Sequence, residues 1–145
     1  MANAKSAECF LDSNYVIALL STRDQRHRAA LTLADALRAK GTKLVTTDAV
    51  LFEIANGLAK PRHRALAIQF LNAVFDGGAV EVVELTASRF AAAYEFYRRR
   101  ADKAWSLDDW LSFLVMSERG LTEALTKDDH FEQAGFAALL RDNSR

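Results

Sequence analysis

The chain has 145 residues, of which 50% are apolar, 26% are charged and one is proline. This length and composition predict a single compact domain over residues 1–145, with its core at about residues 8–141, and exclude a mainly disordered chain. The 19 basic and 19 acidic side chains cancel, which excludes binding of nucleic acid or membrane by net charge alone. Any polyanion partner therefore needs a local site.

Two further features narrow the class of protein. The longest unbroken apolar run, Tyr15 to Leu20, is far shorter than the ~20 residues that cross a bilayer, and residues 1–7 lack the apolar stretch of a signal peptide. Cys9 is the only cysteine, so an internal disulfide and a cysteine-based metal site are both excluded. We expect a cytoplasmic protein that makes no membrane contact and uses Cys9 as a small buried residue.

The first half of the chain alternates short apolar runs with helical repeats. Cys9 to Leu11 predicts a strand that runs into Asp12, and a helix is expected to follow it through residues 16–20. Helical spacing then covers Arg26 to Lys40, where Gly41 is a typical C-terminal cap. The next predictions are a strand at residues 43–46 and a helix whose apolar stripe runs from Val50 to Leu58.

The second half continues the alternation. The expected elements are, in order, a helix at 64–75, a strand at 80–85, a helix from Thr86, a helix between Ser106 and Gly120, a strand at 124–126, a turn at 128–131 and an edge strand at 136–140. Strands that alternate with helices indicate an α/β protein whose mostly parallel sheet, of four or five strands, carries helices on both faces.

Four acidic positions fall where an open parallel sheet has its reactive crevice, outside the carboxyl ends of the strands. Asp12 follows the first strand, Asp128 with Asp129 follows the fourth, Asp109 with Asp108 begins the apolar helix after Ser106, and Glu53 lies early in the helix after the second strand. Carboxylates forced together raise one another's pKa unless a cation sits among them. Ligand sets made only of oxygen favour Mg²⁺ or Mn²⁺.

Each acid also has a purely structural explanation. Asp12 can cap the helix that follows it, Ser106 to Asp109 fits a capping box, and Asp128 with Asp129 can form a turn. Glu53 flanks the buried stripe of its helix, where an unpaired carboxylate is unfavourable, although a solvated position is open to it.

Other polar groups carry weaker signals. The single histidines, His27, His63 and His130, receive no catalytic role. The basic run of Arg98 to Arg100 with Lys103 follows three aromatic residues and could contact phosphates, but a solvated helix end explains it as well.

Four motifs in this order resemble the PIN domain ribonucleases, and among them the toxins of VapC type. The first motif, at residues 10–17, is an apolar strand that runs into Asp-Ser, and the second, at 50–58, is an acid followed by Asn about one turn later. In the third, Ser-Leu-x-Asp begins a helix at 106–109. In the fourth, Thr-x-Asp-x-x-Phe spans 126–131. The resemblance covers about residues 10–140. Its spacing favours Asp109 over Asp108 and Asp128 over Asp129.

The resemblance implies a three-layer α/β/α sandwich, one or two Mg²⁺ or Mn²⁺ ions, and endonucleolytic cleavage of RNA by a dimer that a small antitoxin inhibits. It assigns the site to Asp12, Glu53, Asp109 and Asp128, with Ser13, Asn14 and Asn56 as auxiliary residues. In this hypothesis three aspartates hold the metal and Glu53 helps to hold it or orients the attacking water. The alternatives are a PIN-like module that binds RNA or protein without cutting, and an RNA-processing nuclease outside any toxin–antitoxin pair. Phe52, opposite the apolar stripe of its helix, is a candidate interface residue.

Overall fold

The computed structural model describes residues 7–141 and shows one parallel sheet in that range. Its strands are β1 (Glu8–Leu11), β2 (Lys43–Thr47), β3 (Val80–Val83), β4 (Glu123–Leu125) and β5 (Ala137–Ala138). They are arranged in the order β3-β2-β1-β4-β5, and every neighbouring pair is parallel. The predicted parallel sheet is confirmed, including the fifth strand at its edge.

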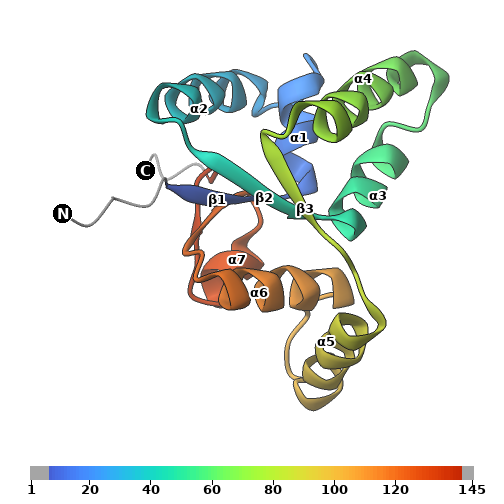
Figure 1. Ribbon diagram of the computed structural model, residues 1–145, viewed down its shortest axis with the longest axis vertical. Helices are drawn as coiled ribbons and strands as arrows, with labels where there is room; N and C mark the ends of the chain where they lie inside the picture. The colour runs from blue at the N-terminus through green and yellow to red at the C-terminus, as the bar shows by residue number, and fades with distance from the viewer. Residues whose placement is uncertain (1–6, 142–145) are drawn as a thin grey trace.

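Helices cover both faces of this sheet (Figure 1). Their bounds are α1 (Ser13–Leu20), α2 (His27–Lys40), α3 (Asp48–Gly57), α4 (Pro61–Gly77), α5 (Ala87–Arg99), α6 (Leu107–Arg119) and α7 (Asp129–Gln133). The first four lie on one side of the sheet and the last three on the other. The predicted three-layer α/β/α sandwich is therefore confirmed.

Several elements begin or end a few residues from the predicted bounds, and two of the differences have a clear physical cause. Helix α4 begins at Pro61 rather than at residue 64, because proline is well suited to the first helical position, where its missing N–H is not needed. The segment predicted as a turn at 128–131 contains the short helix α7. Here the Asp128 side chain caps the helix by accepting a hydrogen bond from the backbone N–H of His130 at 2.9 Å.

The core is built around the central strand. Phe10 and Leu11 of β1 are at most 1% exposed, and burial of each such side chain contributes about 1.5–3 kcal/mol. Below the sheet, Phe113 of α6 meets Phe131 of α7 edge-on at 5.0 Å between ring centroids. Cys9 is also buried, as predicted, and burial raises the pKa of its thiol to about 12.

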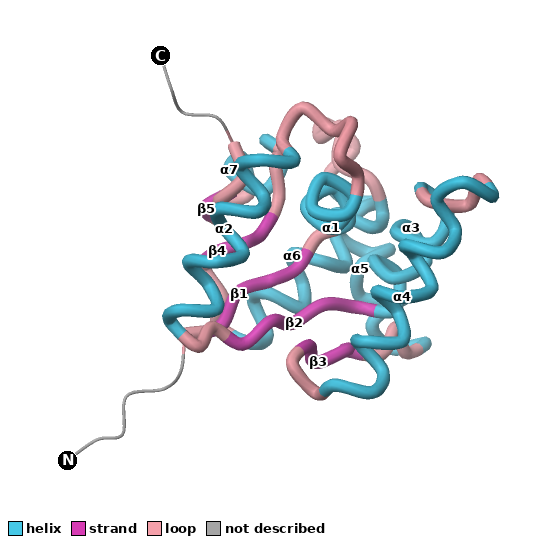
Figure 2. Tube along the Cα trace, turned by 90° about the horizontal axis from the view of Figure 1, so that it is seen from above, coloured by secondary structure: helices cyan, strands magenta, loops and turns pink. Residues whose placement is uncertain are grey.

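The strand order places a switch point at the middle of the sheet. The chain leaves β1 toward β2 and β3 on one side, then returns to add β4 and β5 on the other (Figure 2). Neighbouring strands β1 and β4 thus lead into connections that diverge, which opens a crevice at their carboxyl ends. Between residues 7 and 141, none of the helices has the length and apolar character needed to cross a membrane.

Candidate active site

Asp12 stands at the carboxyl end of β1, at the switch point, and is 8% exposed. It caps α1: its Oδ1 accepts a hydrogen bond from the backbone N–H of Ser13 at 2.9 Å. Its Oδ2 accepts from the Asn14 side chain at 2.9 Å and from the Thr126 hydroxyl at 2.8 Å. The cap predicted from sequence is therefore present, and it leaves the carboxylate at the rim of the sheet.

A buried hydroxyl connects the two neighbouring strand ends. Besides donating to Asp12, Thr126 Oγ1 accepts from Asn14 Nδ2 at 2.9 Å and from the backbone N–H of Asp128 at 3.1 Å. Asn14 Oδ1 in turn accepts from the backbone N–H of Lys127 at 2.8 Å. This network fixes Asp12 and Asp128 relative to each other, although they are far apart in the sequence.

The third acid, Asp109, lies in α6, on the opposite face of the sheet from α1. The capping box predicted at the start of α6 is present: Ser106 Oγ accepts from the Asp109 N–H at 3.1 Å, and Asp109 Oδ2 accepts from the Ser106 N–H at 3.0 Å. Asp109 is thereby held on the site side of the helix. Its neighbour Asp108 is exposed.

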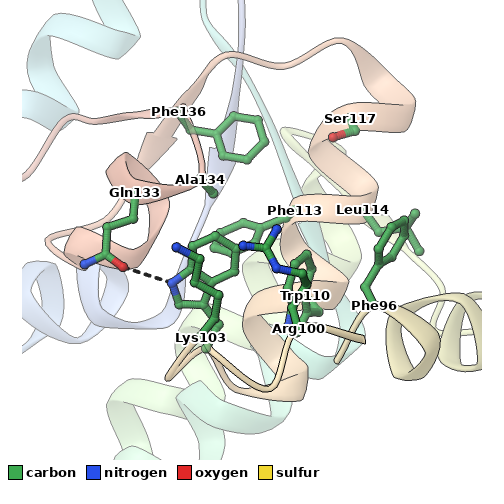
Figure 3. Close-up of a pocket in the computed structure, with 11 residues that line it drawn as sticks. Phe96, Arg100, Lys103, Trp110, Phe113, Leu114, Ser117, Gln133, Ala134 and Phe136 are labelled. Carbon is green, nitrogen blue, oxygen red and sulfur yellow. Dashed lines mark hydrogen bonds between the residues drawn. The ribbon is translucent and has the colours of Figure 1, made fainter. Parts of the chain in front are cut away.

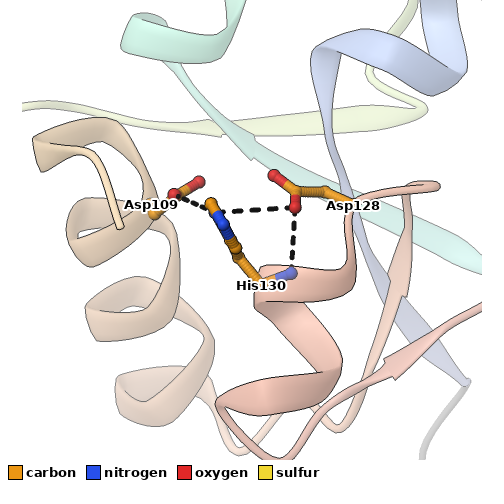
Figure 4. A group of neighbouring side chains, drawn as sticks. All are labelled: Asp109, Asp128 and His130. Atoms are coloured by element: carbon orange, nitrogen blue, oxygen red, sulfur yellow. Dashed lines mark hydrogen bonds and ion pairs between the residues drawn. The ribbon is translucent and has the colours of Figure 1, made fainter. Parts of the chain in front are cut away.

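Asp109, Asp128 and His130 form a compact group (Figure 4). One ligand atom from each lies within 4.8 Å of the others. His130 Nδ1 is 2.9 Å from Asp109 Oδ2 and 3.6 Å from Asp128 Oδ1. Partial burial lowers the pKa of His130, but the hydrogen bond to Asp109 and the charges of the surrounding aspartates outweigh it and raise the pKa overall.

Glu53 faces the other acids from α3. Burial, followed by the charges of Asp108, Asp12 and Asp109, raises its pKa to about 7, while the Ser13 side chain lowers it in part. Although Asp108 is exposed, partial desolvation by the surrounding protein, with some effect of Asp109, also raises its pKa. The predicted position beside the buried stripe is therefore observed: Glu53 is half-buried and close enough to the aspartates to interact with them electrostatically.

Among the described residues, His130 is the basic side chain that contacts the acids, and it carries a charge only when protonated. Burial raises the pKa of Asp12 to about 6 against the opposing hydrogen bonds from Thr126 and Ser13, and Asp128 and Asp109 add to the rise. In the described part of the chain, no lysine or arginine forms an ion pair with these four acids. A converging set of oxygen ligands with unbalanced negative charge fits a divalent cation.

Two of the predicted residues lie apart from this group. Asn56 is exposed, and no side-chain hydrogen bond among residues 7–141 joins it to the acids. Asp129 is exposed at the start of α7, where it accepts a hydrogen bond from Gln133 at 3.3 Å. Ser13 and Asn14 lie at the site, as described above.

Sequence reasoning missed Thr126 and His130. Thr126 was noted only as part of a motif, yet it is fully buried and joins two of the acids. His130 was given no role, but it follows Asp128 by two residues, and a turn of helix there brings its ring back toward the acid. The two-residue spacing between Asp128 and His130 was the sequence signal that could have indicated a role for His130.

The fold and the site together define an α/β protein with a carboxylate-rich crevice at the switch point of a parallel sheet. The family model of the PIN domain matches residues 9–137. The chain belongs to the PIN domain family, and the resemblance drawn from its motifs is confirmed.

The chain is similar to a protein of Mycobacterium tuberculosis named 23S rRNA-specific endonuclease VapC20. The two are 30% identical over 131 residues, which cover 90% of this chain and 96% of the relative. The crystal structure of VapC20, described as a sarcin-ricin loop cleaving toxin, superposes with a TM-score of 0.79 at 28% identity, covering 89% of this chain and 96% of that one.

Two more distant solved structures share the fold. A chain of VapBC2 from Rickettsia felis, solved with a DNA fragment from its promoter, has a TM-score of 0.62 at 16% identity, covering 90% of this chain and 96% of that one. FitAcB from Neisseria gonorrhoeae has a TM-score of 0.59 at 15% identity, covering 90% and 94%.

Proposed function

We propose that this protein is an endoribonuclease toxin of VapC type, which hydrolyses RNA phosphodiester bonds at the acidic site. The observation that carries the proposal is the convergence of Asp12, Glu53, Asp109 and Asp128, from four separate segments, on one crevice. Similarity to VapC20 along 90% of the chain supports the same reaction class. It also makes ribosomal RNA the substrate class to test first.

The carboxylates supply the ligands for a divalent cation. Asp12, Asp109 and Asp128 would hold it, and Glu53 would complete the ligand set or orient the attacking water. When bound, such an ion shields the phosphodiester charge and lowers the pKa of water. Oxygen ligands favour Mg²⁺ or Mn²⁺, and the imidazole of His130 within the group favours testing Mn²⁺ beside Mg²⁺.

The reaction needs no covalent intermediate. Water attacks phosphorus in line with the departing 3′ oxygen, and the chain's contribution is to fix the acids in place. Thr126 and Asn14 position Asp12, and the capping box positions Asp109. Asp109 and Asp128 also hold His130 between them, so a proton on this ring partly compensates their charge when no ion is bound.

Two protein partners are part of the proposal. The structural relatives VapBC2 and FitAcB support a small antitoxin. A homodimer is supported by an apolar face on α3 and α4, where Phe52 is 71% exposed and Phe75 is 68% exposed. These two rings border an apolar hollow of about 250 Å³.

Expression in a bacterial host tests the toxin function. Wild-type protein should arrest growth and leave a discrete ribosomal RNA fragment, whereas Asp12→Asn, expressed to the same level, should do neither. Unchanged growth with folded wild-type protein present would contradict the toxin. An RNA-processing nuclease would cut RNA without arresting growth, and a non-catalytic binding module would leave all RNA intact.

A further inference from the structure

Beside the acidic site, the segment between α5 and α6 borders two hollows that share part of their walls. One, of about 450 Å³, lies against α6 and α7 and has aromatic walls, including Phe96, Trp110 and Phe136 (Figure 3). The other, of about 510 Å³, runs from Tyr97 to Ser106. Arg100, Lys103 and Trp105 line both hollows, so we treat them as one feature, the α5–α6 groove.

The groove reaches residues that neighbour the acidic site. Ser106 lines its near end, and the Ser106 hydroxyl accepts the hydrogen bond from the Asp109 backbone. On the other side, Gln133 of α7 lines its wall and accepts a hydrogen bond from Trp105 Nε1 at 3.0 Å, one turn of helix beyond His130. An RNA strand bound at the acids can therefore continue into the groove.

The groove combines a cation with accessible aromatic rings. The Lys103 ammonium lies 5.3 Å from the centre of the Trp105 ring, and it forms no ion pair within residues 7–141, whereas Arg100 is already paired with Asp102. Phe96 is 43% exposed and Tyr97 is 47% exposed. The wall also holds Trp110 Nε1, a buried donor that has no acceptor among the described residues.

We propose that the α5–α6 groove is a subsite for single-stranded RNA, in which an aromatic side chain stacks with the base next to the cleaved bond and Lys103 holds its phosphate. Stacking on accessible aromatic rings beside a positive charge is how proteins commonly bind unpaired nucleotides. A duplex would keep its bases stacked on each other and leave these rings unused. The subsite also explains how a chain without net charge and with an acidic site holds a polyanion.

The proposal relies on the proposed nuclease activity only for the identity of the polymer, so binding can be measured apart from cleavage. Trp105 and Trp110 are the two tryptophans of the chain, and both line the groove. Intrinsic fluorescence therefore reports on this place alone. A single-stranded RNA of about ten nucleotides, titrated in EDTA at low ionic strength, should quench it.

Two variants with matched controls locate the binding. Lys103→Gln and Tyr97→Ala should each weaken RNA binding several-fold, up to about tenfold, because one removes the phosphate contact and the other an accessible ring. Lys43→Gln, at the amino end of β2, and Phe90→Ala, on α5 outside the groove, should bind as wild type does. Neither control should change hydrolysis of bis(4-nitrophenyl) phosphate, a small phosphodiester that reports on the acidic site itself.

The outcomes separate the two proposals. Quenching that Lys103→Gln and Tyr97→Ala weaken supports the subsite, even if the wild type cuts no RNA, a result that would overturn only the nuclease. RNA cleavage without quenching, or with binding equal in Lys103→Gln and Lys43→Gln, overturns the subsite and leaves the nuclease standing.

Discussion

Thr126 is the residue on which the geometry of the acidic site depends most. Its hydroxyl donates to Asp12 and accepts from Asn14 and from the backbone N–H of Asp128. Thr126→Val keeps the shape but removes a donor to Asp12 and leaves the Asp128 N–H without its acceptor, so it should cost about 1–3 kcal/mol of stability. Loss of a group that orients metal ligands should also weaken Mn²⁺ binding about 10–100-fold. Urea unfolding and calorimetric titration measure the two effects.

Thr46→Val is the matched control. Thr46 is as deeply buried, on β2, and its hydroxyl donates to the backbone carbonyl of Leu11 at 2.7 Å. It contacts none of the acids, so its substitution should lower stability and leave Mn²⁺ affinity unchanged. Equal Mn²⁺ affinity for Thr126→Val and wild type would show that the hydroxyl has no positioning role.

The raised pKa of Asp12 predicts a pH dependence of stability for the metal-free protein. Burial raises this pKa from 3.8 to about 6, so between these pH values the folded chain binds more protons than the unfolded one. The contribution of Asp12 to stability is then largest below about pH 4 and falls by up to about 3 kcal/mol as the pH rises from 4 to above 6. Asp12→Asn removes this loss. Urea unfolding in EDTA should show the variant gaining on the wild type between pH 4.5 and 7, as these pKa values imply, and a difference that stays constant with pH would contradict the assignment.

At the scale of elements, the capping box of α6 has both a structural and a functional effect. Ser106→Ala removes the helix cap, which should cost about 1 kcal/mol of stability. It also removes a group that positions Asp109, so the rate of RNA cleavage should fall by more than the loss of folded protein accounts for. Thr86→Ala removes the cap of α5 by the same chemistry, since Thr86 accepts from the Arg89 N–H at 3.1 Å. Thermal melts and cleavage rates of both variants, compared below their melting temperatures, separate the two effects. Similar cleavage by both variants would mean that the cap serves only the helix.

The elements were largely predictable because their signals are local. Gly41 and Gly120 end helices in the left-handed conformation, and the Ser106 capping box is readable as a four-residue pattern. The short helix α7 was missed because five residues carry too little periodicity to distinguish a helix from a turn. An aspartate at position 128 is as typical of a turn as of a helix N-cap.

The arrangement of the candidate site was only partly predictable, because it depends on contacts between distant segments. The acids could be placed at one rim from the parallel topology alone. Sequence could not show that Thr126 bridges Asp12 and Asp128, nor that the His130 ring lies between two aspartates. It also left the basic run of Arg98 to Arg100 open, and the structure shows its members paired with Glu95 and Asp102 while Lys103 faces the groove.

For the whole molecule, the apolar face on α3 and α4 predicts self-association. Phe52→Ser should shift the protein from dimer toward monomer, because an exposed aromatic ring at the centre of an interface contributes strongly to binding. Leu31→Ser, on α2, changes a side chain that is 45% exposed outside this face and should leave the dimer intact. Sedimentation velocity measures both. A wild-type monomer, or a Phe52→Ser dimer as tight as the wild type, would argue against this interface.

The order of the sheet determines the activity proposed for the whole molecule, since only the return of β4 beside β1 brings Asp128 to Asp12. The most direct test is cleavage of end-labelled ribosomal RNA by purified protein in Mg²⁺ or Mn²⁺, beside EDTA and the Asp12→Asn variant. We predict discrete fragments with the wild type and metal, and intact RNA in both controls. Intact RNA in every lane, or fragments that persist in EDTA or with Asp12→Asn, would contradict a metal-dependent nuclease at this site.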